Sequence, residues 1–163
     1  MQEKDIGKVI DSTVKDGGVL ALLYFDLHGN QKDALQKLGV GFVQKILREP
    51  GVKYAQGEID EPVERDKMFS TSLEIKVLTE DLISLARLCA TYSPFSIEVL
   101  KPGEFLLDIS QLHEILMFLG ATTHDYKKYI MEKVATAEDR ENYKRTLEQR
   151  VKMGEKLMKK GAE

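Results

Sequence analysis

The chain of 163 residues is long enough for one domain with an appendage, and its 42% hydrophobic content is sufficient for a buried core. A formal net charge of −3 gives no reason to expect nucleic acid as a partner, and the single cysteine, Cys89, excludes an internal disulfide. No apolar run approaches the roughly 20 residues that cross a bilayer, so we expect a soluble, cytoplasmic protein without a membrane partner. Lys and Glu dominate the charged residues and Trp is absent, a composition typical of thermophiles.

Residues 2–16 carry apolar side chains at helical spacing, and Gly17 and Gly18 would end this N-terminal helix, which we assign to 1–18. The most apolar run follows, VLALLYFDL at 19–27. Both of its alternating sets are apolar, with Asp26 as the exception, whereas a strand with one face in water alternates more cleanly. The run therefore predicts a central strand that is covered on both faces.

The next segments alternate between helical and strand patterns. We expect a helix at 31–48, a strand at 52–61, a charged hairpin tip at 64–67, a strand at 68–78, a helix at 80–92 capped by Thr79, and a strand at 95–101. The order βαββαβ within 19–104 predicts an α+β fold, the ferredoxin-like plait, with a four-stranded antiparallel sheet and two helices on one face. Its other face needs a cover.

The last third, 105–163, predicts a helical extension that could supply this cover. Asp108 and Gln111 have the spacing of a capping box and open a helix that Gly120 would end. A second helix is expected at about 123–134. Thr136 and Asp139 repeat the capping pattern before a long helix at 137–160.

The stretch 42–100 resembles the ligand-sensing domain of the Lrp/AsnC regulators and, more loosely, ACT domains. The shared features are a helix running into PGVKYAQGEID, an alternating strand, a helix starting TEDL and a closing strand SIEV. The resemblance implies a ferredoxin-like domain that associates through its sheet and binds amino acids or similar effectors at the interface.

The best candidate ligand site is the segment 26–31, which follows the central strand and opens a helix, where free backbone N–H groups attract anions. Asp26, His28, Gly29 and Asn30 are the candidate ligand-binding residues. The alternative interpretation is a turn in which Gly29 supplies backbone freedom and Asn30 caps the helix.

Residues that could perform catalysis or bind a metal are scattered. His28, His113 and His124 lie in separate elements without the close pairing typical of zinc ligands. The acidic residues between Glu58 and Glu64 flank the expected hairpin tip and predict a solvated cluster. We expect no catalytic residue, no metal and no cofactor.

The last helix carries a narrow apolar seam at coiled-coil spacing, formed by Tyr143, Leu147, Val151, Gly154 and Met158. We expect Tyr143, Leu147, Val151 and Met158 to contact a partner. The basic end of this helix could touch RNA, but such ends are more often solvated and matched to the helix dipole.

These patterns predict a non-catalytic regulatory or small-molecule-sensing module that acts as a homo-oligomer, a dimer or a higher assembly. The first alternative is a structural or assembly protein that binds another protein through its C-terminal helices. The second is a small enzyme that uses the segment 26–30.

Overall fold

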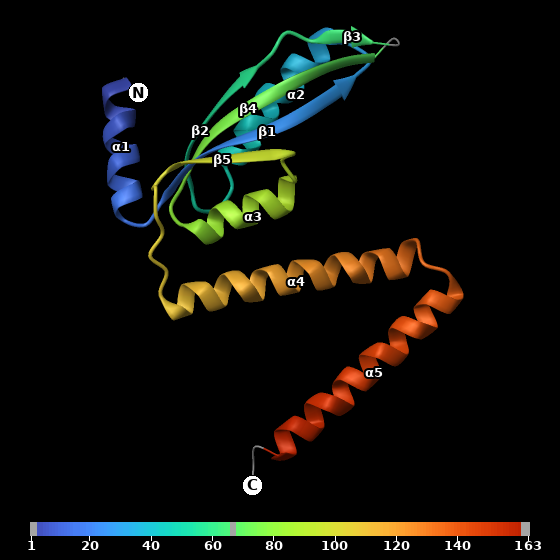
Figure 1. Cartoon of the computed structure of the whole chain (residues 1–163). Helices are drawn as coiled ribbons and strands as arrows, with labels where there is room; N and C mark the ends of the chain where they lie inside the picture. The colour runs from blue at the N-terminus through green and yellow to red at the C-terminus, as the bar shows by residue number, and fades with distance from the viewer. Residues whose placement is uncertain (1–2, 66–67, 161–163) are drawn as a thin grey trace. The chain divides into compact units, whose positions relative to one another are not determined.

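The computed structural model describes residues 3–65 and 68–160, with side chains for 5–64 and 68–153. It is an α+β protein whose described residues form five helices and a five-stranded sheet, in two compact units, Met1–Ile115 and Leu116–Glu163 (Figure 1). We call them the sheet unit and the helical unit. The elements in chain order are α1 (Glu3–Lys15), β1 (Val19–Gly29), α2 (Lys32–Leu47), β2 (Val52–Ile59), β3 (Val63–Arg65), β4 (Met68–Thr79), α3 (Leu82–Tyr92), β5 (Ser96–Lys101), α4 (Ile109–Lys133) and α5 (Ala137–Lys160).

The sheet has the strand order β2–β4–β1–β5, and the short β3 pairs with β4. All of these pairings are antiparallel. β1 pairs with β4 along its whole length, from Val19 opposite Thr79 to Gly29 opposite Phe69. The prediction that β1 lies inside the sheet is therefore confirmed, because β4 and β5 flank it.

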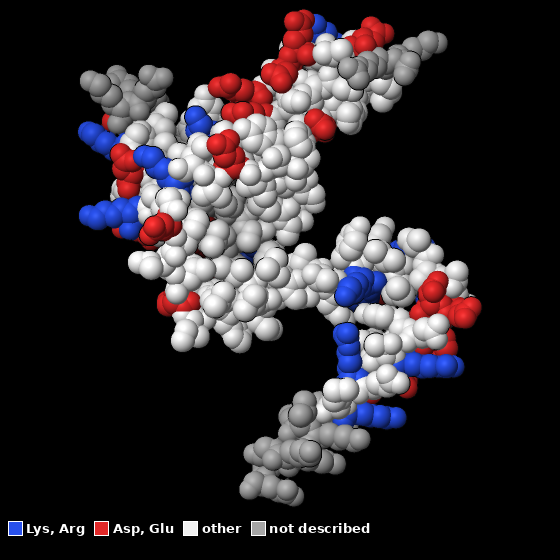
Figure 2. All heavy atoms as spheres, in the orientation of Figure 1, with Lys and Arg blue, Asp and Glu red and all other residues white. Residues whose placement is uncertain are grey.

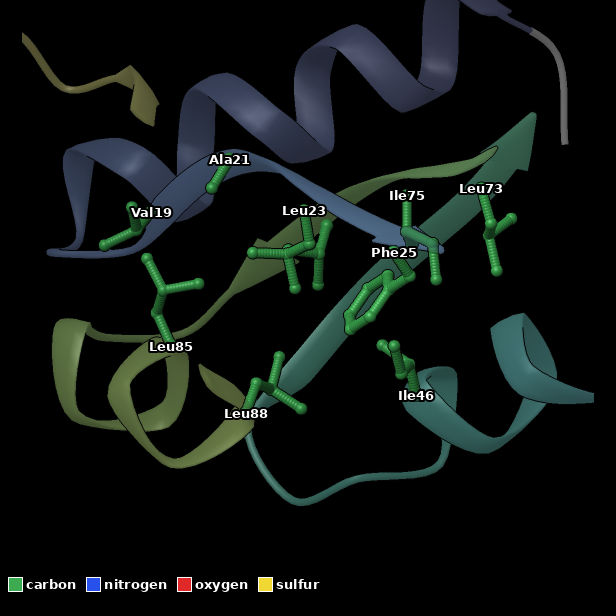
Figure 3. Packing of buried hydrophobic residues seen from close by; sticks show 10 residues of the cluster. Val19, Ala21, Leu23, Phe25, Ile46, Leu73, Ile75, Leu85 and Leu88 are labelled. Carbon is green, nitrogen blue, oxygen red and sulfur yellow. The ribbon is translucent and has the colours of Figure 1, made fainter. Parts of the chain in front are cut away.

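One face of the sheet carries the hydrophobic core (Figure 3). Alternate residues of β1 and β4 point toward α2 and α3, as the two-residue period of a strand requires. The core consists of Val19, Ala21, Leu23, Phe25, Ile46, Leu73, Ile75, Val77, Leu85 and Leu88. Edge-to-face aromatic pairs then link the elements, with ring centroids 4.8 Å apart for Phe25 and Phe42 and 5.3 Å apart for Phe42 and Tyr92.

Two glycines allow α2 to lie close to β2. A Cβ added to Gly39 would lie 2.5 Å from Cδ1 of Ile59, and one added to Gly57 would lie 2.4 Å from Cγ2 of Val43. Each glycine thus makes room for a branched side chain of the other element. The helix keeps Gly39 despite its low helix propensity because this side of α2 is packed against the sheet.

The second face of the sheet is covered at one end by α1. Leu20 and Leu78, which are paired on this face, are buried, and α1 contacts both strands. Beyond this end, Leu22 and Tyr24 are only half-buried, and their paired residues on β4 and β5 are polar. We call this remainder the open face. Within the sheet unit, the cover that we expected from the C-terminal extension is thus provided in part by α1.

Three local predictions were wrong. β1 continues through His28 to Gly29, because both residues pair with β4 where a loop was expected. Residues 64 and 65, expected at a hairpin tip, belong to β3. The cap of α3 is Asp81, whose Oδ1 accepts a hydrogen bond from the Ser84 N–H at 2.7 Å, while Thr79 ends β4.

The C-terminal extension contains two helices where three were expected. α4 runs without a break from Ile109 to Lys133, and Gly120 lies inside it. Both predicted capping boxes are confirmed: Asp108 and Gln111 exchange backbone-to-side-chain hydrogen bonds of 2.8 and 3.1 Å before α4, and Thr136 and Asp139 do so before α5. In the part of the chain that the structure describes, every helix lacks the length or the apolar character that a membrane span requires.

Candidate functional site

The predicted ligand residues lie on a strand. Asp26 and His28 point to the open face, because they alternate with the core residue Phe25, and both are exposed. Their partners on β4 are Ser72 and Ser70. Nδ1 of His28 and Oγ of Ser70 are joined by a hydrogen bond of 2.9 Å. The structure therefore brings two of the four predicted residues together in a polar patch with two serines.

The other two predicted residues are separated from this patch. Gly29 ends β1 and faces α2, where an added Cβ would lie 3.2 Å from Cδ2 of Leu35. Asn30 is exposed, and the N-cap of α2 is Gln31, which makes no side-chain capping bond. The alternative prediction that Asn30 caps this helix is therefore wrong.

The middle of the open face is acidic around a tyrosine. Tyr24 lies opposite Glu74 on β4, which in turn lies opposite Glu58 on β2. Oη of Tyr24 donates a hydrogen bond of 3.4 Å to Glu98 of β5. Desolvation raises the pKa of Tyr24 above its usual value, and the charges of Glu74 and Glu98 raise it further. Tyr24 thus stays protonated, and its hydroxyl donates to Glu98.

Acidic side chains also gather over β3 (Figure 2). Glu61 pairs with Lys32 at 2.8 Å, and this hydrogen bond and charge lower the pKa of Glu61. The Glu61 side chain is nevertheless 84% exposed. A general acid or base needs a carboxylate that is held in a pocket, so this cluster does not form an acid–base pair.

Metal-binding and nucleophilic groups form no site in the described residues. No three His, Cys, Asp or Glu side chains there are grouped so that they could hold a metal ion. Cys89 is a free, half-buried thiol on α3, and burial raises its pKa. It packs against the core, in agreement with the structural role expected of a buried cysteine.

A pocket of about 420 Å³ lies beside the start of α3 in the sheet unit. Its walls combine apolar and charged side chains from α1, α3, α4 and the segment that follows β5. The apolar members include Val14, Leu82, Ile83, Phe105 and Ile115, and the charged ones are Lys15, Asp81, Glu104 and Glu114. Its volume falls in the range of small-molecule sites.

The helical unit exposes many apolar side chains and buries none of its described residues. On α4, Leu116, Leu119 and Tyr126 are 59%, 51% and 67% exposed. Helices of this length are normally stabilised by burying one face. Much of the side of α4 seen in Figure 2 carries no charge. The further exposed apolar residues of this unit are Met117, Tyr129, Val134, Val151 and Met153.

The predicted partner-contact residues of α5 divide into three groups. Tyr143 and Leu147 are half-buried and line a hollow of about 700 Å³ between α5 and α4. Val151 is 61% exposed. The side chain of Met158 lies outside the described residues. The hollow has an apolar floor, to which Leu119 and Met131 contribute, and the basic residues His124, Lys127 and Arg150 line it as well.

The sequence showed the apolar positions of α4, but their continuity across Gly120 was missed. Leu116, Leu119, Thr123, Tyr126 and Ile130 follow spacings of three and four, which is the heptad pattern. This signal was hidden because Gly120 was expected to end the helix. Reading the pattern across this glycine would have shown it.

Comparison with known protein families gives a match over most of the chain. The model of the MJ0538 family matches residues 20–151, which include α4 and all of the sheet except Val19, the first residue of β1. No curated protein matches the chain. No solved structure matches it either.

Proposed function

Because the chain belongs to the MJ0538 family, whose match spans both units, we propose that the two units act together as a self-associating regulatory or assembly module without a catalytic step. In this proposal the sheet unit is a ferredoxin-like plait with β3 as an addition. The helical unit is the element through which copies of the chain associate into a homodimer or a higher oligomer.

The observation that carries the proposal is the lack of a core in the helical unit. Its described residues include none that is buried, although α4 and α5 together expose Leu116, Tyr126 and Val151. Exposed apolar surface of this extent is characteristic of protein interaction sites. Association would bury it and stabilise both helices.

The acidic, half-apolar open face is a weaker candidate for self-association. Glu58, Glu74 and Glu98 would meet their counterparts on a second sheet, and like charges brought together are unfavourable. Beside the exposed apolar residue Tyr126 on α4, the chain carries charges of both signs, Asp125 and Lys127. This difference favours the helices over the sheet-to-sheet association implied by the resemblance to Lrp/AsnC domains.

Light scattering coupled to size exclusion tests the proposal on the full chain over a range of concentrations. We expect a dimer or a higher oligomer, and stronger hydrogen-exchange protection of α4 and α5 as the concentration rises. Val151→Asp should weaken association while the sheet stays folded. A monomeric mass at every concentration would show that the proposal is wrong.

A small-molecule effector is the second candidate function, favoured by the pocket beside α3. Its apolar wall together with Lys15 and Glu104 suits a small ligand that has both an apolar part and charged groups. A thermal-shift screen of amino acids, nucleotides and metal ions should find a ligand that raises the melting temperature.

Two variants distinguish the pocket from the segment that includes His28. Lys15→Ala should reduce the ligand-induced shift if the ligand occupies the pocket, whereas His28→Ala should reduce it if the ligand lies on the open face. A screen without any shift would remove this second candidate. The free thiol of Cys89 suits a reducing compartment, so we place the protein in the cytoplasm as part of the same proposal.

A further inference from the structure

We propose that two copies of this chain associate by packing their α4 helices antiparallel, each α4 entering the notch between α4 and α5 of the other copy. This inference rests on the self-association proposed above and names its surface, its partner and its geometry. It differs from the sequence-based expectation, which placed the contact on α5.

The surface is a continuous stripe on α4, which consists of Leu116, Leu119, Thr123, Tyr126 and Ile130. At 100° per residue these positions lie within an arc of about 80°, so they form one side of the helix. None of the five is charged, and three are more than half exposed. The centre of a protein interface is depleted of charge in the same way.

The notch is the hollow between α4 and α5 described above, and it can accommodate a helix of the second copy. Leu119 and Thr123 belong to the stripe and also line the hollow between α4 and α5. Across the hollow, Tyr143 and Leu147 turn their half-buried side chains toward it. A helix laid along the stripe would contact both α4 and α5, and two such hairpins would complete a four-helix bundle.

The exposed apolar area of the helical unit is close to the area that a dimer of this chain would need to bury. The exposed parts of Leu116, Leu119, Tyr126, Tyr129 and Val151 amount to on the order of 600 Å², and with polar neighbours this approaches the roughly 800 Å² per partner of a stable interface. An uncharged stripe can also pack against itself without bringing like charges together.

The charges along α4 determine the direction. Near its start α4 carries Glu114, and Asp108 caps it. Near its end it carries three lysines, Lys127, Lys128 and Lys133, and two acidic residues, Asp125 and Glu132. A parallel pair would bring both basic ends together. An antiparallel pair brings each acidic start toward a basic end, which is the favourable arrangement.

The heptad spacing restricts the register, and the proposed pairing is centred on Ala121. In an antiparallel coiled coil, the a positions of one helix face the d positions of the other. Leu116 and Thr123 occupy a positions, and Leu119 and Tyr126 occupy d positions. Leu116 therefore faces Tyr126 of the second copy, and Leu119 faces Thr123. Both pairs are centred on Ala121. Leu116 of one copy then lies about 15 Å along the axis from Leu116 of the other, at 1.5 Å per residue.

A matched pair of charge substitutions in the full chain tests the surface. Leu116 and Met117 are adjacent and almost equally exposed, at 59% and 61%, but Met117 lies off the stripe. Leu116→Glu should raise the dimer dissociation constant by about tenfold or more, as loss of a central interface contact does, whereas Met117→Glu should leave it nearly unchanged. Sedimentation measures the constant, and circular dichroism checks that both variants are folded.

Single cysteines in a Cys89→Ser background test the direction. A disulfide needs Cα atoms within about 7 Å. Leu116→Cys alone and Tyr126→Cys alone should therefore stay unlinked on oxidation, while a mixture of the two variants should form the mixed disulfide. Self-linking of Leu116→Cys would show a parallel pair, and the absence of any link in a dimeric mixture would show another interface.

These outcomes separate the two proposals. A wild-type chain that is monomeric at all concentrations overturns both of them. A dimer that tolerates Leu116→Glu, or whose Leu116→Cys variant links to itself, overturns only the antiparallel α4 pairing and leaves self-association standing.

Discussion

The sheet unit and the helical unit place the same kind of side chain in opposite environments. Leu23 on β1 is completely buried, whereas Leu116 on α4 is 59% exposed. β1 has a neighbouring strand on each side and two helices over its core face, while α4 has α5 as its neighbour in the helical unit. The comparison indicates that the sheet unit is stabilised by its own core, whereas the described residues of the helical unit form none, and this is why we propose that the unit associates.

The same substitution in the two units gives the largest expected difference. Leu23→Ala should lower the free energy of unfolding by about 3 to 5 kcal/mol, because it leaves a cavity in a packed core. Leu116→Ala should lower it by less than about 0.5 kcal/mol in the dissociated chain, as surface substitutions do. Urea unfolding at high dilution, followed by circular dichroism, measures both. Equal losses would contradict the contrast between the units.

Alanine substitutions at two glycines of α2 test how closely this helix packs against β2. Gly41→Ala should stabilise the protein by about 0.5 to 1 kcal/mol, because alanine favours the helix and nothing lies within 4 Å of the added Cβ. Gly39→Ala should yield a smaller gain or a loss, since its Cβ would press on Ile59. If Gly39→Ala proved the more stabilising variant in chemical denaturation, α2 could not lie as close to β2 as described.

Tyr92 makes the stability of the sheet unit depend on pH in the alkaline range. Desolvation and a hydrogen bond to Glu49 raise its pKa from 10.0 to about 12. The folded state thus favours the neutral phenol, so this contribution is fully present below pH 10 and is lost as the pH rises toward 12. Tyr92→Phe should be less stable than the wild type at pH 8, and the difference should shrink above pH 10 in parallel denaturation series. A difference that grows with pH would have the wrong sign.

The smallest effect is expected at His28. Its hydrogen bond to Ser70 is exposed to solvent, so His28→Ala should lower the stability by less than about 1 kcal/mol. Ser70→Ala serves as the control from the other side of the bond. Thermal unfolding should show similar small shifts for both variants. A loss above about 2 kcal/mol would mean that the open face is covered there.

Much of the sheet unit could be predicted because its signals are local and dense. The run 19–27 has apolar residues in both alternating sets, and this pattern indicated an inner strand before any pairing was known. The caps of α4 and α5 were also predictable, since a capping box is complete within four residues. The candidate ligand segment was harder, because the turn signals began at His28 while pairing with β4 extended the strand to Gly29.

The sequence by itself determined the elements whose causes lie within a few residues: the long strands, the charged and apolar sides of the helices, and the capping boxes. The tertiary structure alone decided which surfaces meet. The continuity of α4 through Gly120 was still within reach of the heptad pattern, since a glycine costs a helix only about 1 kcal/mol. In contrast, pairing with β4 carried β1 on to Gly29, and α1 covered the end of the second face at Leu20, because no local pattern records such contacts.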